Sequence, residues 1–255
     1  MNNLTRHPIT ILVLSFLTMW LSAQIGGFFR KRQGNLEEAE LQDRDVIVVA
    51  TLTLLALIIG FSFSMAISRY EQRKDYEEAE ANAIGTEYVR ADLLSAVDAA
   101  TVRALLKDYL DQRILFYRTG DERELQQIIV RTAQLQTKLW STVRAQATAQ
   151  PTPVLALAVS GMNDVLNSQG YTQAAWWNRI PVGAWILMAA VAICSNLLVG
   201  YGARRAQGGV IRLLVLPLVL CIAFFLIADI DSPRRGVIRV SPQNLTSLAE
   251  SLRGH

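Results

Sequence analysis

The stretch VIVVATLTLLALIIGFSFSMAISRYEQRK, residues 46–74, decides the fold class of this chain. Residues 46–68 carry no charge, and at a helical rise of about 1.5 Å per residue they reach roughly 34 Å, enough to cross a hydrocarbon core of about 30 Å. The first half of this stretch is apolar, whereas the second half contains a glycine and three serines. Small and hydroxyl side chains allow another helix, or water, to approach closely. We therefore predict a transmembrane helix that lines a pore.

The rest of the chain contains three further apolar runs, and 51% of the 255 residues are apolar. This composition is too apolar for an ordinary soluble domain. The first run could be a signal peptide, but it is long and three basic residues follow it, so we interpret it as a retained span. The sequence thus predicts an all-α polytopic membrane protein with four transmembrane helices, at 9–29, 46–68, 180–202 and 210–230.

A helical domain is predicted between the two pairs of spans. The second span continues into a proline-free segment rich in Glu, Ala and Arg, which predicts one long helix reaching Val89 with its carboxylates on solvated faces. Apolar residues then recur at three- and four-residue spacing, as in a helix bundle. The predicted bundle helices are 98–118, 121–149 and 153–169. The predicted domains are a membrane hairpin (1–68), a soluble helical domain (69–179), a second membrane hairpin (180–230) and a C-terminal tail (231–255).

Enzymatic chemistry finds little support in the sequence. Cys194 and Cys221 lie inside predicted spans, where burial makes a thiol inert, and His7 and His255 lie at the chain ends. We find no metal-ligand spacing, no phosphate-binding glycine loop and no nucleophile elbow. The net charge of +3 is too small to indicate a nucleic-acid partner. We expect no catalytic residues, no metal and no cofactor.

One face of the second span is the candidate functional site. Its members are spaced by four, four, three and four residues, which places them on one side of a helix. If several copies surround an axis, Leu57 and Phe61 would form an apolar constriction with hydrated serines beyond it. Alternatively, this face packs against the other spans of the same chain, and spacing alone does not decide between the two. The candidate pore-lining residues are Thr53, Leu57, Phe61, Ser64 and Ser68.

Three segments carry a resemblance to a known family. They are GFSFSMAISRYEQRK (60–74), EEAEANAIGTEYVRADLL (77–94) and DIDSPRRGVIRVSPQNLTSL (229–248). Together they resemble the bacterial bestrophin-like domain family, membrane proteins distantly similar to bestrophin chloride channels. The resemblance implies a homopentamer in the bacterial inner membrane, with a pore lined by the second span and with the helical domain and both termini cytoplasmic.

The resemblance also implies a narrow neck made of three large apolar residues one helical turn apart. These positions fall on Thr53, Leu57 and Phe61, and Thr53 departs from the pattern. Arg69 would favour anions at the pore mouth, whereas Asp229 and Asp231 there would favour cations. These two aspartates are also the nearest counterpart of the calcium clasp found in some bestrophins, but we infer no calcium site from them.

The sequence therefore predicts an oligomeric channel that passes small anions such as chloride, with the bilayer and further copies of the chain as its partners. A second hypothesis is a membrane-anchored structural or regulatory protein whose helical domain binds a soluble partner. A cation channel is the third. Lys and Arg are nearly balanced across the membrane, so the positive-inside rule leaves the orientation open.

Overall fold

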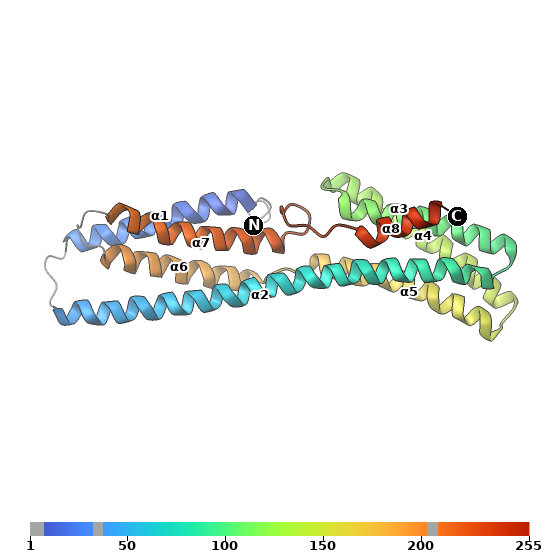
Figure 1. Cartoon of the computed structure of the whole chain (residues 1–255), viewed down its shortest axis with the longest axis horizontal. Helices are drawn as coiled ribbons and strands as arrows, with labels where there is room; N and C mark the ends of the chain where they lie inside the picture. Colours follow the sequence, from blue (N-terminus) through green and yellow to red (C-terminus); the bar gives the residue numbers. More distant parts are fainter. Residues whose placement is uncertain (1–7, 33–37, 203–208, 255) are drawn as a thin grey trace. The chain divides into compact units, whose positions relative to one another are not determined.

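The computed structural model describes residues 8–32, 38–202 and 209–254, and within these ranges the chain is helical with no strand. Four described helical segments are long and apolar enough to cross a membrane. The predicted all-α, four-span fold class is therefore confirmed. The helices are α1 (Pro8–Arg32), α2 (Glu38–Arg90), η2 (Ala91–Leu93), α3 (Ala96–Arg118), α4 (Glu122–Ala149), α5 (Pro153–Trp177), α6 (Val182–Gly202), α7 (Gly209–Asp231) and α8 (Gln243–Arg253) (Figure 1).

The chain forms two compact units. The membrane unit comprises Met1–Ser68 and Arg179–Ile238, and the helical unit comprises Arg69–Asn178 and Arg239–His255. Helix α2 contributes to both units because it continues without a break from Glu38 to Arg90. The C-terminal helix α8 belongs to the helical unit.

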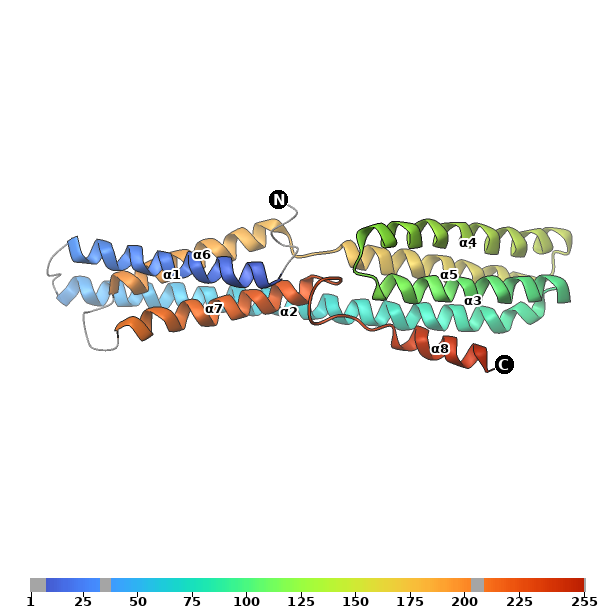
Figure 2. The same cartoon turned by 90° about the horizontal axis from the view of Figure 1, so that it is seen from above.

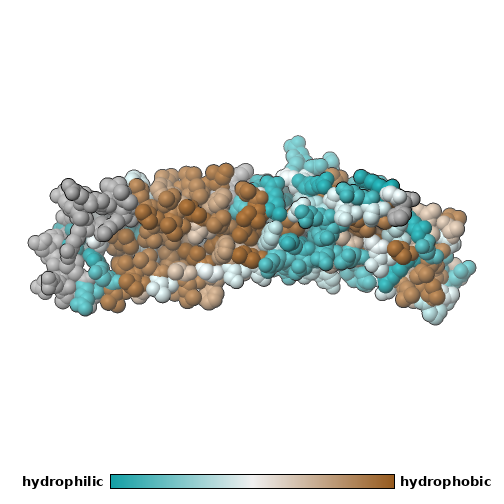
Figure 3. Space-filling view, viewed as in Figure 1, coloured by the Kyte–Doolittle hydropathy of each residue, from teal (hydrophilic) through white to brown (hydrophobic). Residues whose placement is uncertain are grey.

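In the membrane unit, α1 packs against both α6 and α7, and the three helices lie side by side (Figures 1 and 2). Apolar side chains cover much of the face of this unit that is visible in Figure 3, whereas hydrophilic side chains dominate the visible face of the helical unit. An exposed apolar surface of this kind is expected where lipid or another chain replaces water.

Helices α1 and α6 approach each other at two glycines. A Cβ atom on Gly26 would lie 2.0 Å from the carbonyl oxygen of Leu197, and one on Gly200 would lie 1.9 Å from that of Ala23. Next to this crossing, the Ser22 hydroxyl donates a hydrogen bond of 2.7 Å to the Ile193 carbonyl. Small residues that let two backbones meet, together with an interhelical hydrogen bond, are typical of helix packing in membranes.

In the helical unit, each bundle helix begins with a side-chain cap. Ser95 accepts from the Asp98 amide at 3.3 Å, Asp121 caps α4, and Thr152 accepts from the Leu155 amide at 3.2 Å. Such caps satisfy amides that lack an intrahelical partner. The helices enclose an apolar core that includes Leu106, Leu110, Leu135, Leu139, Met162 and Val165.

Several predicted details differ from the structure. Helix α5 does not end near Gly170 but continues to Trp177. In this added length, Trp176 is only 4% exposed and packs on Phe116 and Tyr117. Helix α2 begins at Glu38, eight residues before the predicted second span. Of the residues that join the predicted spans 180–202 and 210–230, those at 203–208 lie outside the described residues.

Candidate pore-lining face of helix α2

The buried side of α2 in the membrane unit is defined by three residues. Leu55 is 1% exposed, Ser62 is 4% exposed and Ala66 is fully buried. Their spacing of seven and four residues keeps them on one side of the helix. This side faces the other helices of the same chain.

The predicted pore-lining residues lie on the opposite side of α2. Thr53, Ser64 and Ser68 are exposed, and Leu57 and Phe61 are 53% and 65% exposed. Gly60 is also on the open side, since a Cβ atom there would meet nothing within 4 Å. The alternative interpretation, in which this face packs against the other spans of the same chain, is therefore not what the structure shows.

The Thr53 hydroxyl on this face forms a hydrogen bond within the helix. Thr53 donates to the Val49 carbonyl at 2.8 Å, so its hydroxyl proton is engaged within the helix while its oxygen remains an acceptor. Along this face, an apolar band at Leu57 and Phe61 thus lies between a threonine on one side and two serines on the other. If such an order of side chains were repeated around an axis, it could hydrate an ion on each side of a narrow, easily dewetted segment.

The predicted pore-mouth carboxylates are engaged within the membrane unit. Asp229 is 1% exposed and accepts from the amides of Val237 at 2.7 Å and Ile238 at 2.8 Å. Asp231 is 6% exposed and accepts from the Ile180 amide at 3.1 and 3.2 Å. These bonds tie the loop after α7 and the start of α6 to the end of α7.

Gly236 lies in the same loop after α7. Gly236 is required here because a Cβ atom would lie 2.3 Å from the Asp229 carbonyl oxygen. Among the described residues, no group of three or more His, Cys, Asp or Glu side chains is arranged to hold a metal ion. The role of Asp229 and Asp231 at a pore mouth remains a prediction. Arg69, the third predicted pore-mouth residue, is partly buried just beyond the apolar stretch of α2.

Beyond the apolar stretch, α2 carries a row of buried charged residues that the sequence analysis placed on a solvated face. Arg73, Glu77, Glu80 and Glu87 are each 2% exposed or less. Glu80 forms a buried ion pair with Arg113 of α3, whose Nη2 also lies 3.4 Å from Glu80 Oε2.

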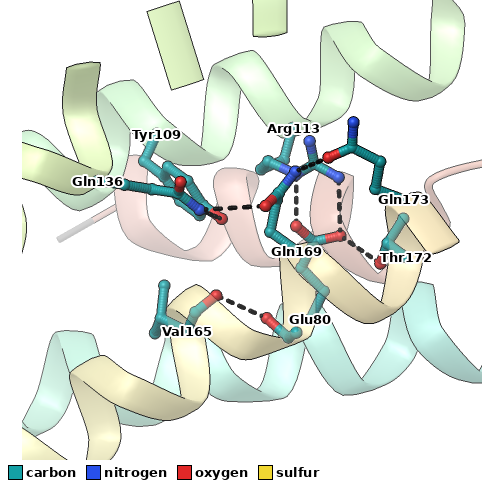
Figure 4. A network of polar contacts seen from close by, with 9 residues as sticks. Glu80, Tyr109, Arg113, Gln136, Val165, Gln169, Thr172 and Gln173 are labelled. Carbon is teal, nitrogen blue, oxygen red and sulfur yellow. Dashed lines mark hydrogen bonds and ion pairs between the residues drawn. The ribbon is translucent and has the colours of Figure 1, made fainter. Parts of the chain in front are cut away.

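The Glu80–Arg113 pair is the centre of a polar network inside the helical unit (Figure 4). The Thr172 hydroxyl donates to Glu80 Oε2 at 3.1 Å, and the Arg113 guanidinium lies 4.4 Å from the centroid of the Phe116 ring. Burial alone would lower the pKa of Arg113, but the adjacent Glu80 carboxylate and its hydrogen bond raise it, so the guanidinium stays charged. Burial and the Glu80 charge raise the pKa of Tyr109. The network therefore holds a compensated ion pair among neutral polar groups.

A second buried carboxylate of α2 holds the C-terminal helix. Glu77 accepts from the Leu245 amide at 2.9 Å and from Asn244 Nδ2 at 2.7 Å. Its charge thereby satisfies an orphan amide in the first turn of α8. Further along, Gly85 faces Leu248, because a Cβ atom would lie 3.2 Å from Leu248 Cδ1. Gly85 thus marks a point of close packing between α2 and α8.

One feature of the sequence indicates that these charged residues are buried. Ala66, Arg73, Glu80 and Glu87 are seven residues apart, so they stay within about 20° per step of the side that is packed in the membrane unit. Extending the buried side of the span along α2 would have placed them in the core. Their partners Arg113 and Thr172 come from distant segments and carry no such signal.

Comparison with known proteins agrees with this architecture, which defines a polytopic helical membrane protein with an inserted helical unit. A family model described as Bestrophin-like domain matches residues 15–245. The chain therefore belongs to the Bestrophin-like domain family. A search of curated proteins finds no match.

Solved structures share the fold at low sequence identity. A bacterial bestrophin homologue from Klebsiella pneumoniae is 13% identical with a TM-score of 0.68, covering 96% of this chain and 97% of that chain. A point mutant of that homologue has a TM-score of 0.66 at 13% identity, covering 97% and 98%. A variant described as a membrane protein has a TM-score of 0.62 at 13% identity, covering 97% of each chain. These similarities extend over nearly the whole chain.

Proposed function

We propose that this protein is an oligomeric ion channel that passes small anions such as chloride through a central pore. The pore is lined by one face of α2 from each subunit. The observation that carries this proposal is the exposure of that face, opposite the side of α2 that packs within the chain. Its residues are Thr53, Leu57, Phe61, Ser64 and Ser68.

The chemistry of the face fits passive conduction. Leu57 and Phe61 form the constriction, where loss of water closes the path and widening reopens it. The edges of phenyl rings carry partial positive charge and attract anions, and Arg69 adds a full positive charge next to the polar end of the face. Because Asp229 and Asp231 are buried and bound to backbone amides, they give little support to cation selectivity.

A single α2 helix cannot enclose a conduit, so the proposal requires several subunits about one axis. Membership of the Bestrophin-like domain family supports a homopentamer in a bacterial inner membrane, with the helical unit and both termini in the cytoplasm. The proposal is for a channel without a catalytic reaction, a cofactor or a nucleic-acid partner.

The direct test is anion flux from liposomes that contain the purified protein. We expect chloride efflux from the native protein and a several-fold faster efflux from Phe61→Ala, because a smaller side chain widens the constriction. Phe63→Ala is the matched control: Phe63 is 37% exposed, and two residues further along it lies about 200° around the helix. Efflux from this control should equal that of the native protein.

Three outcomes would contradict the proposal. The first is the absence of flux from native protein, and the second is the same flux in Phe61→Ala as in native protein. The third is a monomer or dimer in native mass spectrometry, since one helix per subunit then encloses no pore. A small assembly would favour a membrane-anchored protein whose helical unit recruits a soluble partner. Reversal potentials in asymmetric salt separate anion from cation conduction.

A further inference from the structure

Glu87 is a buried carboxylate with no hydrogen-bond partner among the residues that the structure describes. It lies near the end of α2 in the helical unit, and its side chain is 0% exposed. Neither carboxylate oxygen has a hydrogen-bond partner within the described part of the chain. The other two buried carboxylates of α2 have partners: Glu77 accepts a hydrogen bond from the start of α8, and Glu80 forms an ion pair with Arg113. A buried charge without a donor is costly, so the neutral acid is the favoured form of Glu87.

Helix α5 fits closely over this carboxyl group. A Cβ atom on Gly161 would lie 2.1 Å from Glu87 Oε2 and 2.5 Å from Arg90 Nη1. Only a residue without a side chain can occupy this position while both side chains keep their places. Gly161 therefore marks a point of close contact between α5 and the Glu87 and Arg90 side chains of α2.

The charged groups that shift the pKa of Glu87 come from two helices. On α2, Arg90 stabilises the ionised form, and on α5 Asp164 opposes it. Burial is the largest influence, and it raises the pKa of Glu87 to about 8 from an ordinary value of 4.5.

We propose that Glu87 is a proton-binding site that controls the packing of α2 on α5. In its protonated form it fits the enclosed space beneath Gly161 and the two helices stay packed. In its ionised form it draws water and loosens the contact. This inference goes beyond the channel proposal and does not depend on it, because the switch is a property of the helical unit itself.

The sign of the pH dependence follows from proton linkage. An opened contact exposes Glu87 and returns its pKa toward 4.5, whereas the packed contact holds it at about 8. Packing is therefore most favoured below about pH 4.5, weakens as the pH rises, and stops changing above about pH 8. If the whole pKa difference acted on the contact, the opening constant would change by up to about tenfold per pH unit. Because solvent screens part of this effect, we expect a change of roughly tenfold over the whole range from pH 6 to 8.

The test is hydrogen–deuterium exchange of the full-length protein in detergent at pH 6 and pH 8. Comparing Glu87→Gln with native protein at each pH cancels the intrinsic pH dependence of amide exchange. In native protein, we expect the exchange protection of peptides from 81–93 and 155–165 to fall about tenfold from pH 6 to pH 8. This fall is measured relative to the same peptides in Glu87→Gln. Glu78→Gln, an exposed glutamate on the same helix, should behave as native.

A second variant keeps the proposal falsifiable if Glu87→Gln does not fold. Asp164→Asn removes the anion that opposes ionisation, so the pKa of Glu87 falls and the loss of protection should level off at lower pH. Equal pH profiles in native protein and Glu87→Gln would overturn the proposal. So would an unchanged profile in Asp164→Asn.

Discussion

Removing Arg113 should destabilise the helical unit more than any surface change of similar size. Arg113 and Glu80 are 1% and 0% exposed and form an ion pair. Arg113→Met fills similar volume but leaves the Glu80 charge buried and unpaired, which costs about 3–5 kcal/mol. Because Thr172 still donates to Glu80 at 3.1 Å, we expect the lower end of this range, about 3 kcal/mol.

A double-mutant cycle tests the origin of that cost. Glu80→Gln combined with Arg113→Met removes the buried charge, so the double variant should lose only about 1 kcal/mol. The assay is pulse proteolysis of the full chain in detergent across a urea series. The control is Arg253→Met, which breaks an exposed ion pair to Asp111 of 3.2 Å and should cost at most about 1 kcal/mol.

This reasoning is refuted by either of two results. The first is a loss in Arg113→Met as small as that in Arg253→Met, which would mean that water reaches the buried carboxylate. The second is a double variant as unstable as the sum of its single variants, which would mean that the two side chains do not depend on each other.

Two further perturbations follow from close contacts in each unit. Gly200→Leu places a side chain where a Cβ atom would already lie 1.9 Å from a backbone oxygen of α1, so the melting temperature in detergent should fall by several degrees. The control is Gly27→Ala, where the nearest atom to the added Cβ would be 3.6 Å away, and this variant should melt at the temperature of native protein. Glu77→Gln weakens the charge-assisted bond to the Leu245 amide, so proteases should release α8 several-fold faster than in Glu78→Gln, and equal rates would contradict the role of Glu77.

The membrane spans were predictable because a long uncharged apolar run has few other uses in a protein. The prediction that α2 continues into the helical unit was also correct, since nothing between 69 and 90 breaks a helix. The end of α5 was not predictable from local signals. Ser168, Gln169 and Gly170 suggest a helix end, but Thr172, Ala175 and Trp176 are buried beyond them. Their burial outweighs the cost of about 1 kcal/mol for an internal glycine.

The candidate pore-lining face was found from spacing, but spacing could not tell exposure from packing. That distinction depends on where the other spans lie, which follows from contacts such as the α1–α6 crossing at Gly26 and Gly200. The buried charges were missed for a related reason. From sequence alone, a glutamate is assigned to the surface unless its partner is known. The partner of Glu80 could not be recognised because Arg113 lies 33 residues away in sequence.

The continuity of α2 links these two observations. The buried side of the helix keeps its phase from Ala66 through Arg73 and Glu80 to Glu87, while its composition changes from small and apolar to charged. A step of seven residues turns an α-helix by only about 20°, so the same side of α2 can stay buried as its composition changes. Within the helical unit, the ion pair between Glu80 and Arg113 fixes the rotation of this part of α2, because a turn of the helix would leave both charges buried and unpaired.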